Sequence, residues 1–228
     1  MSRIERLLAA LLVLGAISSA RAQEASWDGL RRVASKRLQY VYLLPGADFR
    51  QYRKVTIDPP QVAFRKDWAQ DVNRGERDPS RMITQSDVQR IQKALSEGFE
   101  QALSTDFTKA GWQVVKAPGP DVLHLTPFLL DVDANPQRTS EGRADTYTVE
   151  PGRAAVGLEV RDSDTNQLLG RVVDRQETQS FGGKLMISDS VTNRADFGAM
   201  LQAWSRVFVE GLATLKGASP IGASVQQK

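Results

Sequence analysis

The chain has 228 residues, of which 41% are hydrophobic and 25% are charged, and its formal net charge is +3 at pH 7. This hydrophobic content is enough for a packed core, so the chain as a whole is not intrinsically disordered. It contains no cysteine, which excludes disulfides, thiolate nucleophiles, cysteine-ligated zinc and iron–sulfur clusters. A single histidine, His124, excludes any metal site that needs two imidazoles.

The first 22 residues have the pattern of a secretory signal peptide. Arg3 and Arg6 form a short positive region, residues 7–17 are almost entirely apolar, and Ala20-Arg21-Ala22 offers the small side chains that a signal peptidase requires. The apolar run of about 11 residues is too short to span a bilayer as a membrane anchor. We therefore expect cleavage after Ala22 and export to the periplasm, with secretion as the alternative. We expect no transmembrane segment, and there is no cysteine to carry a lipid anchor.

Removal of residues 1–22 changes the charge of the chain. Three arginines and one glutamate leave with them, so that 27 basic and 26 acidic groups remain and the net charge becomes +1. Nucleic-acid-binding proteins usually have a clear basic excess, so we expect no nucleic-acid partner. The remaining charge is uneven, because residues 24–66 hold nine basic and four acidic groups.

The basic stretch 24–66 also contains aromatic side chains, and this mixture favours contact with an anionic partner. We predict that the partner is an envelope protein or an anionic glycan. The predicted contact residues are Tyr42, Arg50, Tyr52, Arg53, Lys54, Arg65 and Lys66. The alternative is a set of ordinary solvated charges beside the first strand, because such an offset is common in folded proteins.

The first predicted elements of the folded chain are short. Apolar spacing allows a helical turn over residues 27–34, and residues 38–43 favour a strand. Leu44-Pro45-Gly46-Ala47-Asp48 is typical of a turn, because proline fixes one φ angle and glycine frees the next.

A strand with a break is predicted next. Residues 52–57 and 61–64 form one extended segment, interrupted by Asp58-Pro59-Pro60 because neither proline has an N–H to donate. Residues 69–82 are polar and rich in Asp, Asn, Gly and Pro, which predicts a loop.

Two amphipathic helices are the clearest elements. One begins at Thr84-Gln85-Ser86-Asp87, where Thr84 can cap free N–H groups and Asp87 favours the positive helix end, and it ends near Gly111. Its apolar stripe consists of Val88, Ile91, Leu95, Phe99, Ala102 and Leu103. The other follows residues 193–196 and ends at Gly217. Its stripe consists of Phe197, Met200, Leu201, Trp204, Phe208, Leu212 and Leu215.

Between the helices the pattern is that of strands. Residues 112–115 predict a short strand, and 122–132 a longer one in which Pro127 indicates an edge or a bulge. Residues 117–120 are typical of a turn, and the polar residues 133–145 predict a loop.

The later strands form a predicted hairpin. Residues 146–149 begin another strand, and 154–161 and 168–178 flank the Asp- and Asn-rich link 162–167, which is typical of a turn. The small, polar tail 218–228 predicts disorder.

These elements predict the fold class α+β. We expect a single two-layer domain over residues 23–217, in which a mostly antiparallel sheet is covered on one face by the two helices.

The candidate motifs for chemistry are all incomplete. His124 lies inside a predicted strand, and no G-x-S-x-G nucleophile motif accompanies it. The stretches that start at Asp131 and Asp162 imitate a calcium loop but lack its glycine and its terminal glutamate. Gly182-Gly183-Lys184 lacks the first glycine and the hydroxyl residue of a phosphate-binding loop. We therefore predict no catalytic, cofactor-binding or metal-ligating residue, and no cofactor.

Three stretches of the chain resemble a known family. The first runs from Tyr42 to Phe49 and continues through Tyr52, Val55, Ile57-Asp58-Pro59, Val62, Phe64 and Trp68. The other two are Ala117-Pro118-Gly119-Pro120-Asp121-Val122-Leu123 and Ser190-Val191-Thr192-Asn193-Arg194-Ala195-Asp196-Phe197, which leads to Trp204. Together, over residues 27–216, they are similar to the bacterial domain-of-unknown-function family 3313, small exported proteins often described as lipoproteins. The resemblance implies no catalytic residue, and this chain has no cysteine to acylate.

These observations predict an exported envelope protein that acts as a non-catalytic binding or assembly module. One alternative is a carrier of a small ligand or lipid, which predicts a sizeable apolar cavity between the sheet and the helices. Another is a hydrolase that uses carboxylates alone, drawn from Asp131, Asp133, Glu159 and Asp174. That mechanism requires two of these side chains to meet in a cleft.

Overall fold

The computed structural model describes residues 28–141, 144–177, 185–188 and 198–222. The strands are β1 (Arg31–Val33), β2 (Tyr40–Leu43), β3 (Lys54–Ile57), β4 (Gln61–Phe64), β5 (Gln113–Val114), β6 (Val122–Glu141), β7 (Ala144–Asp162), β8 (Leu168–Glu177) and β9 (Leu185–Ser188). The helices are α1 (Trp68–Arg74), α2 (Gln85–Lys109) and α3 (Gly198–Ala218), and a 3₁₀ turn covers Pro79–Arg81.

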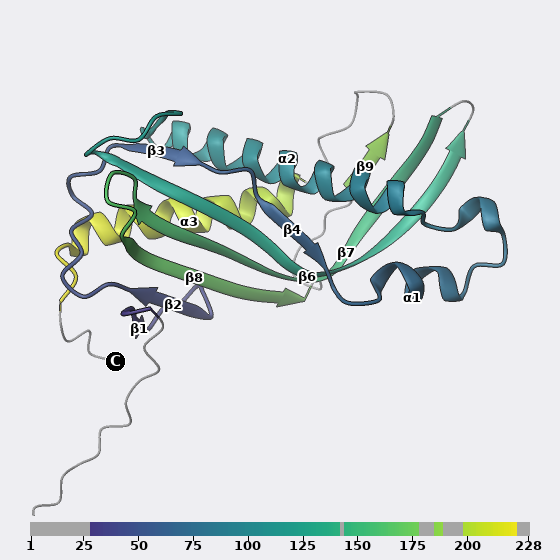
Figure 1. Cartoon of the computed structure of the whole chain (residues 1–228), viewed down its shortest axis with the longest axis horizontal. Helices are drawn as coiled ribbons and strands as arrows, with labels where there is room; N and C mark the ends of the chain where they lie inside the picture. Colours follow the sequence, from purple (N-terminus) through teal and green to yellow (C-terminus); the bar gives the residue numbers. More distant parts are fainter. Residues whose placement is uncertain (1–27, 142–143, 178–184, 189–197, 223–228) are drawn as a thin grey trace, which may run out of the picture.

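Within the described residues the strands form one nine-stranded mixed sheet (Figure 1). Its order is β1-β2-β8-β7-β6-β3-β5, with β4 beside β6 and β9 beside β7. β3 and β4 run parallel to β6, and β5 runs parallel to β3. The other pairings are antiparallel, so the predicted combination of helices with a mostly antiparallel sheet is confirmed.

β3 and β4 are the two halves of the predicted broken strand, and Pro59 and Pro60 lie between them. The N–H of Asp58 donates to the carbonyl of Leu125 on β6, at 2.9 Å. Pro127 lies two residues further along β6 and therefore faces the same break. The prediction that Pro127 marks an edge or a bulge is wrong, because an interior strand tolerates a missing N–H that faces a gap.

β6 and β7 continue as an arm beyond the rest of the sheet, and β9 pairs with β7 in this arm (Figure 1). The predicted loop over residues 133–145 is therefore wrong, because strand pairing continues from Asp133 opposite Arg153 to Glu141 opposite Ala144. The register shifts after Leu130, and such an irregularity bends a strand. Backbone pairing requires no apolar side chain, so the polar composition hid this strand.

The link between β7 and β8 is the predicted turn. Oδ1 of Asp162 accepts hydrogen bonds from the N–H of Asp164 at 3.0 Å and of Thr165 at 2.7 Å. Asn166 has a φ of 58°, which its short polar side chain tolerates. The aspartate that imitated a calcium ligand therefore holds the backbone of the turn.

α2 begins and packs as the sequence predicts. The hydroxyl of Thr84 accepts from the N–H of Asp87, and Oδ2 of Asp87 accepts from the N–H of Thr84 at 2.8 Å, which completes a capping box. Its buried side chains include the predicted stripe residues Ile91, Leu95, Phe99, Ala102 and Leu103. They face α3 and the strands β3, β4 and β5.

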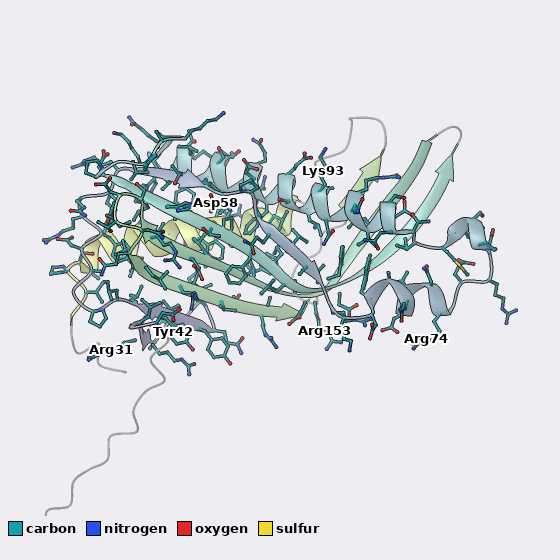
Figure 2. The ribbon with its side chains drawn as sticks, in the orientation of Figure 1. Arg31, Tyr42, Asp58, Arg74, Lys93 and Arg153 are labelled. Atoms are coloured by element: carbon teal, nitrogen blue, oxygen red, sulfur yellow. The ribbon has the colours of Figure 1, made fainter. Side chains whose placement is uncertain are left out.

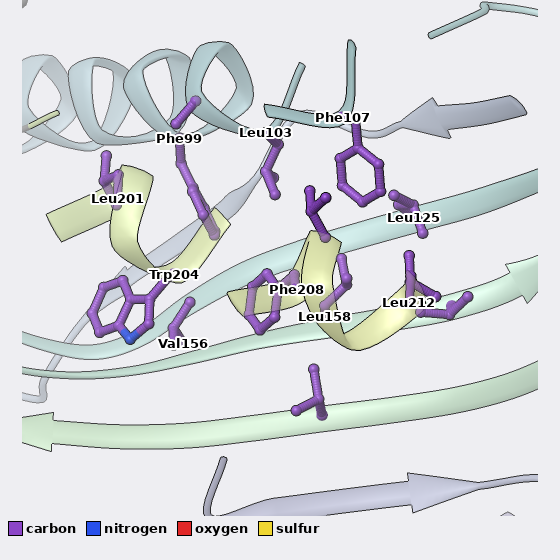
Figure 3. Close-up of a cluster of buried hydrophobic side chains, with 14 of the residues drawn as sticks. Phe99, Leu103, Phe107, Leu125, Val156, Leu158, Leu201, Trp204, Phe208 and Leu212 are labelled. Atoms are coloured by element: carbon purple, nitrogen blue, oxygen red, sulfur yellow. The ribbon is translucent and has the colours of Figure 1, made fainter. Parts of the chain in front are cut away.

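α3 completes the core beside α2. Phe208 and Leu212 of α3 lie with Val156 and Leu158 of β7 in one apolar cluster (Figure 3). The helix continues through Gly217 to Ala218, one residue beyond the predicted end. Its predicted start at residues 193–197 lies outside the described part of the chain.

The segment after α3 packs onto the core. Ile221 is only 6% exposed, and it exchanges backbone hydrogen bonds of 2.8 Å with Gly46 and Ala47. The prediction of a disordered tail is therefore wrong for residues 218–222. Gly46 has a φ of 82°, in agreement with the turn predicted there.

Two further predictions near the N-terminal side are wrong. A helical turn is expected over residues 27–34, but this segment contains strand β1, which pairs with β2. The loop expected over residues 69–82 contains α1 and the 3₁₀ turn. Trp68 anchors α1, because it is buried and stacks on Phe64 with ring centroids 4.0 Å apart.

None of the helices in the described residues combines the length and apolarity needed to cross a membrane.

Candidate functional site

An apolar cleft lies between α3 and the edge of the sheet formed by β2 and β8. It has a volume of about 390 Å³ and is open to solvent. Its strand residues are Val33, Val41, Leu43, Val160, Gly170, Arg171 and Val172. Its α3 residues are Val207, Phe208, Glu210, Gly211, Leu212, Thr214 and Leu215. Residues 34–38, which connect β1 to β2, close one side of it.

The cleft arises from where the helices lie on the sheet. α2 packs on β3, β4 and β5, and α3 packs on α2, so β2 lies beyond the helix pair. Val41 opposes Val172 and Leu43 opposes Gly170 in register, which turns these two β2 side chains toward the helix side. The apolar inner face of β2 therefore forms a wall of the cleft.

An ion pair crosses the mouth of the cleft. Arg37, on the connection before β2, pairs with Glu210 of α3, and each side chain is 56% exposed. A smaller cavity of about 220 Å³ begins beside this pair. Its lining is Arg37, Asp174, Ala203, Trp204, Arg206, Val207 and Glu210. The two cavities thus share the ion pair.

The mouth holds more cations than the ion pair uses. Lys36 lines the larger cavity and Arg206 the smaller one, and both are exposed. Neither side chain has an ion-pair partner among the described residues. Asp174 is 5% exposed, and its Oδ1 accepts the N–H of Gln39 at 3.2 Å.

Tyr52, one of the predicted contact residues, is buried rather than on the surface. Its hydroxyl donates to Oδ2 of Asp162 at 2.6 Å, and burial together with this bond raises the pKa of Tyr52 to about 12. The inclusion of Tyr52 in a contact surface is therefore wrong. An aromatic residue in a basic stretch looks like a surface ligand, but here it ties the start of β3 to the β7–β8 turn.

The basic members of the predicted contact set are largely paired within the chain. Arg50 donates to both oxygens of Asp48, which holds the pKa of that carboxyl at about 2. Lys54 pairs with Asp121 at 3.1 Å. Arg65 pairs with Asp71 and Asp133. Arg53 and Lys66 are exposed.

The predicted contact residues also do not gather in one place. Lys54 lies opposite Val122 of β6, and Phe64, next to Arg65, lies opposite Val132. Ten residues of strand separate these positions, or roughly 30 Å. Tyr42 lies on β2, near Arg31 of β1 (Figure 2). The structure therefore does not bring the predicted contact residues together, and the partner surface stays a prediction.

Two of the candidate carboxylates, Glu159 and Asp174, lie on opposite faces of the sheet. Glu159 is bound by Arg161 at 3.0 Å and by Arg171 at 2.6 Å. Asp174 lies opposite Val156, three residues from Glu159 on β7, and therefore on the other face. Asp131 is exposed and pairs with Arg175. The alternative of a carboxylate-dependent hydrolase is not supported by this arrangement.

His124 lies in β6, inside the strand that the sequence predicts, and is partly exposed. Its Nε2 is 2.8 Å from Oδ2 of Asp58, and Thr126 donates to the same oxygen at 2.8 Å. Asp58 is labelled in Figure 2, beside the gap between β3 and β4. The threonine hydroxyl is thus engaged by the carboxylate rather than by the imidazole.

The sequence predicted an apolar cavity only as a consequence of the carrier alternative and pointed to none of its residues. Gly211 is the signal that could have located it. Glycine costs about 1 kcal/mol relative to alanine inside a helix, so an interior glycine is a position at which to look for close packing or an open space. Gly211 lies inside α3 and lines the cleft.

Comparison with protein families assigns the chain to a group. A model described as "Protein of unknown function (DUF3313)" matches residues 21–208. The chain belongs to this family. Membership of the DUF3313 family confirms the resemblance seen in the sequence and assigns no activity. No curated protein matches this DUF3313 chain.

The DUF3313 chain is also similar to solved structures, at low scores. One is a PelC dodecamer from Paraburkholderia phytofirmans, with 11% identity, a TM-score of 0.36, and coverage of 75% of this chain and 95% of that one. A putative neuraminyllactose-binding hemagglutinin homolog from Helicobacter pylori has 13% identity, a TM-score of 0.31, and coverage of 73% and 89%. A minor lipoprotein from Acinetobacter baumannii has 12% identity, a TM-score of 0.27, and coverage of 70% and 94%. At these scores the similarity carries no functional argument.

Proposed function

We propose that this DUF3313 protein is an exported, non-catalytic binding protein of the bacterial cell envelope. In this proposal the cleft between α3 and β2 holds the apolar part of a small ligand. The observation that carries the proposal is the cleft itself, with its volume of about 390 Å³. Pockets for small ligands typically have about 300–1,000 Å³ and are mostly apolar with a few polar groups.

The packing of the rest of the molecule supports this interpretation. Protein interiors are packed as densely as organic crystals. α2 and its strands are closed in this way, and Phe99 and Leu103 are fully buried. A gap of this size beside such a core is consistent with a space that another molecule fills.

The positions of two candidate carboxylates give no support to the alternative of a carboxylate-dependent hydrolase. Glu159 and Asp174 lie on opposite faces of the sheet, and Glu159 is held by two arginines. The export part of the proposal rests on the signal-peptide pattern of residues 1–22. Within the envelope we propose the periplasm as the location.

The binding proposal is tested with N-phenyl-1-naphthylamine, a probe that fluoresces in an apolar site. We expect saturable binding of one probe per chain. Gly211→Leu fills the cleft, because a Cβ added at Gly211 meets no atom within 4 Å. We expect this variant to lose about tenfold or more in probe affinity, a loss equivalent to burying roughly two methylenes.

Gly217→Leu is the matched control. Gly217 lies in the same helix, also has no atom within 4 Å of an added Cβ, and is not part of the cleft. We expect its probe affinity to equal that of the unmodified protein. Absence of saturable probe binding to the unmodified protein would contradict the proposed function, and so would equal losses in the two variants.

A further inference from the structure

Gly211 is the point at which the backbone of α3 lines the cleft. The residue lies in the interior of the helix, where glycine is unfavourable relative to alanine. A Cβ added there meets no protein atom within 4 Å, so the glycine does not serve the packing of this chain. Gly98 of α2 differs, because a Cβ there would lie 3.4 Å from Leu201. The space above Gly211 is instead part of the cleft.

The shape of the cleft favours a narrow apolar group. The α3 wall consists of Phe208, Leu212 and Leu215 on either side of the glycine, and the opposite wall of Val41 and Val172. At about 390 Å³ the cleft is near the lower end of the range for small-molecule pockets. One unbranched hydrocarbon chain fits this space better than the two chains of a membrane phospholipid.

The mouth of the cleft favours negative charge. Lys36 and Arg206 lie on either side of the Arg37–Glu210 pair, one at each cavity, and neither has an ion-pair partner within the described part of the chain. The Arg37–Glu210 pair is exposed, and exposed pairs exchange partners at little cost. The two adjoining cavities are therefore lined by three cations, Lys36, Arg37 and Arg206, and by two carboxylates, Glu210 and the buried Asp174.

We propose that the ligand is a single-chain anionic amphiphile. Its hydrocarbon chain lies over Gly211 in the larger cavity, and its anionic head is bound at the mouth by Lys36, Arg37 and Arg206. This inference rests on the proposed function and names the ligand class for the same cleft. Charge-assisted hydrogen bonds from arginine and lysine are the interactions that recognise carboxylate and phosphate groups.

Three probes with the same chain test the inference: dodecyl phosphate, dodecyl maltoside and dodecyltrimethylammonium. Each probe is titrated into the full protein with N-phenyl-1-naphthylamine bound, at concentrations below its own micelle concentration. The loss of fluorescence measures displacement. We expect dodecyl phosphate to act at concentrations at least tenfold lower than the cationic probe, with the neutral maltoside between them. We expect the double variant Lys36→Gln, Arg206→Gln to weaken dodecyl phosphate about tenfold and to leave the maltoside unchanged.

The double variant Lys93→Gln, Arg74→Gln is the matched control, because it removes the same charges from α2 and α1, outside the cleft (Figure 2). We expect it to bind all three probes as the unmodified protein does. All four substitutions are at exposed positions, so circular dichroism should show an unchanged fold.

The possible failures can be told apart. Displacement by none of the probes, with no binding of the fluorescent probe, overturns the proposed function and this inference together. Equal displacement by the three probes, unaffected by Lys36→Gln and Arg206→Gln, overturns only the anionic head. Sedimentation velocity tests the other occupant, a second copy of the chain. A dimer that Gly211→Leu abolishes, without amphiphile binding, overturns the inference.

Discussion

The two halves of the helix layer differ in how they meet the sheet. Under α2 the core is closed: Ile91, Phe99 and Phe107 are 0% exposed, and Gln92 and Ser96 donate to carbonyls of residues 60–62. Under α3, toward β2, the core opens into the cleft, and an exposed ion pair spans the gap.

This difference separates what the fold requires from what it permits. Apolar burial and satisfied polar groups stabilise the α2 half, and they are properties that any folded domain needs. α3 is also an amphipathic helix, but it does not extend across the sheet far enough to cover β2. A stable fold was therefore achieved without closing this edge, and the open edge is where a ligand can bind.

The largest expected effect is the loss of a side chain from the closed half. Phe99→Ala removes a fully buried ring that lies 6.4 Å from the ring of Phe208, and we expect it to lower the free energy of unfolding by about 3–5 kcal/mol. Leu215→Ala, at the half-buried wall of the cleft, should lower it by less than about 1.5 kcal/mol. Urea unfolding followed by circular dichroism measures both. Similar losses in the two variants would show that the halves are equally packed.

A smaller effect is expected where Tyr52 ties the closed end of the sheet together. Tyr52→Phe leaves Oδ2 of Asp162 without its hydroxyl donor, and we expect a loss of about 1.5–3 kcal/mol at pH 7. Burial alone would raise the pKa of Asp162, but the bonds from Tyr52, Thr165 and Asp164 outweigh it and hold that pKa below its ordinary value of 3.8.

The direction of each pH dependence follows from these pKa values. Asp162 favours its ionised form in the fold, so its contribution is complete above pH 3.8 and is lost as the pH falls through its lowered pKa. Tyr52 favours its neutral form, so its contribution is lost as the pH rises from about 10 through 12. Tyr52→Phe should therefore unfold with a shallower pH dependence at both extremes. A variant with the pH profile of the unmodified protein would contradict this account.

The sequence predicted well the elements that have a local pattern, and it did not predict the β6–β7 arm or the cleft. The apolar stripe and cap of α2, the break at Pro59-Pro60 and the β7–β8 turn are local patterns with a direct physical cause, and they are confirmed. The β6–β7 arm was missed because its pairing depends on the backbone. The cleft was missed because it depends on how far α3 reaches across the sheet, and no local pattern specifies that distance.

The basic stretch shows why charge alone was a poor guide to the site. Arg50 and Arg65 lie in the predicted contact set, but their nearest carboxylates are Asp48 and Asp71, two and six residues away. Lys36 and Arg206 were not in that set, and the fold brings them from opposite ends of the chain to two adjoining cavities that share Arg37 and Glu210. Chain topology, rather than local charge density, determines which cations remain available.

Two helix-interior glycines sharpen the comparison between the halves. Gly98→Leu adds atoms at the α2–α3 contact, where an added Cβ would lie 3.4 Å from Leu201, and overpacking of this kind costs about 1–3 kcal/mol. Gly211→Leu adds the same atoms to the cleft and should raise the free energy of unfolding by about 0.5–1 kcal/mol, because leucine favours the helix. Opposite shifts in thermal midpoint are the expected result. A destabilising Gly211→Leu would show that the cleft is filled by this chain itself.

The smallest stability effect is expected at the ion pair that spans the open half. Arg37 and Glu210 are each 56% exposed, so Glu210→Gln should change the free energy of unfolding by less than about 1 kcal/mol. The same change should raise the affinity for dodecyl phosphate several-fold, because it frees Arg37 and removes the carboxylate that repels the anionic head. Displacement titrations and urea unfolding on one sample separate the two effects. Glu97→Gln on α2, which removes an exposed carboxylate away from the cleft, is the control and should alter neither. If Glu210→Gln lowers the stability and leaves the affinity unchanged, the ion pair stabilises the fold. If it raises the affinity at constant stability, Glu210 competes with the anionic head of the ligand for Arg37.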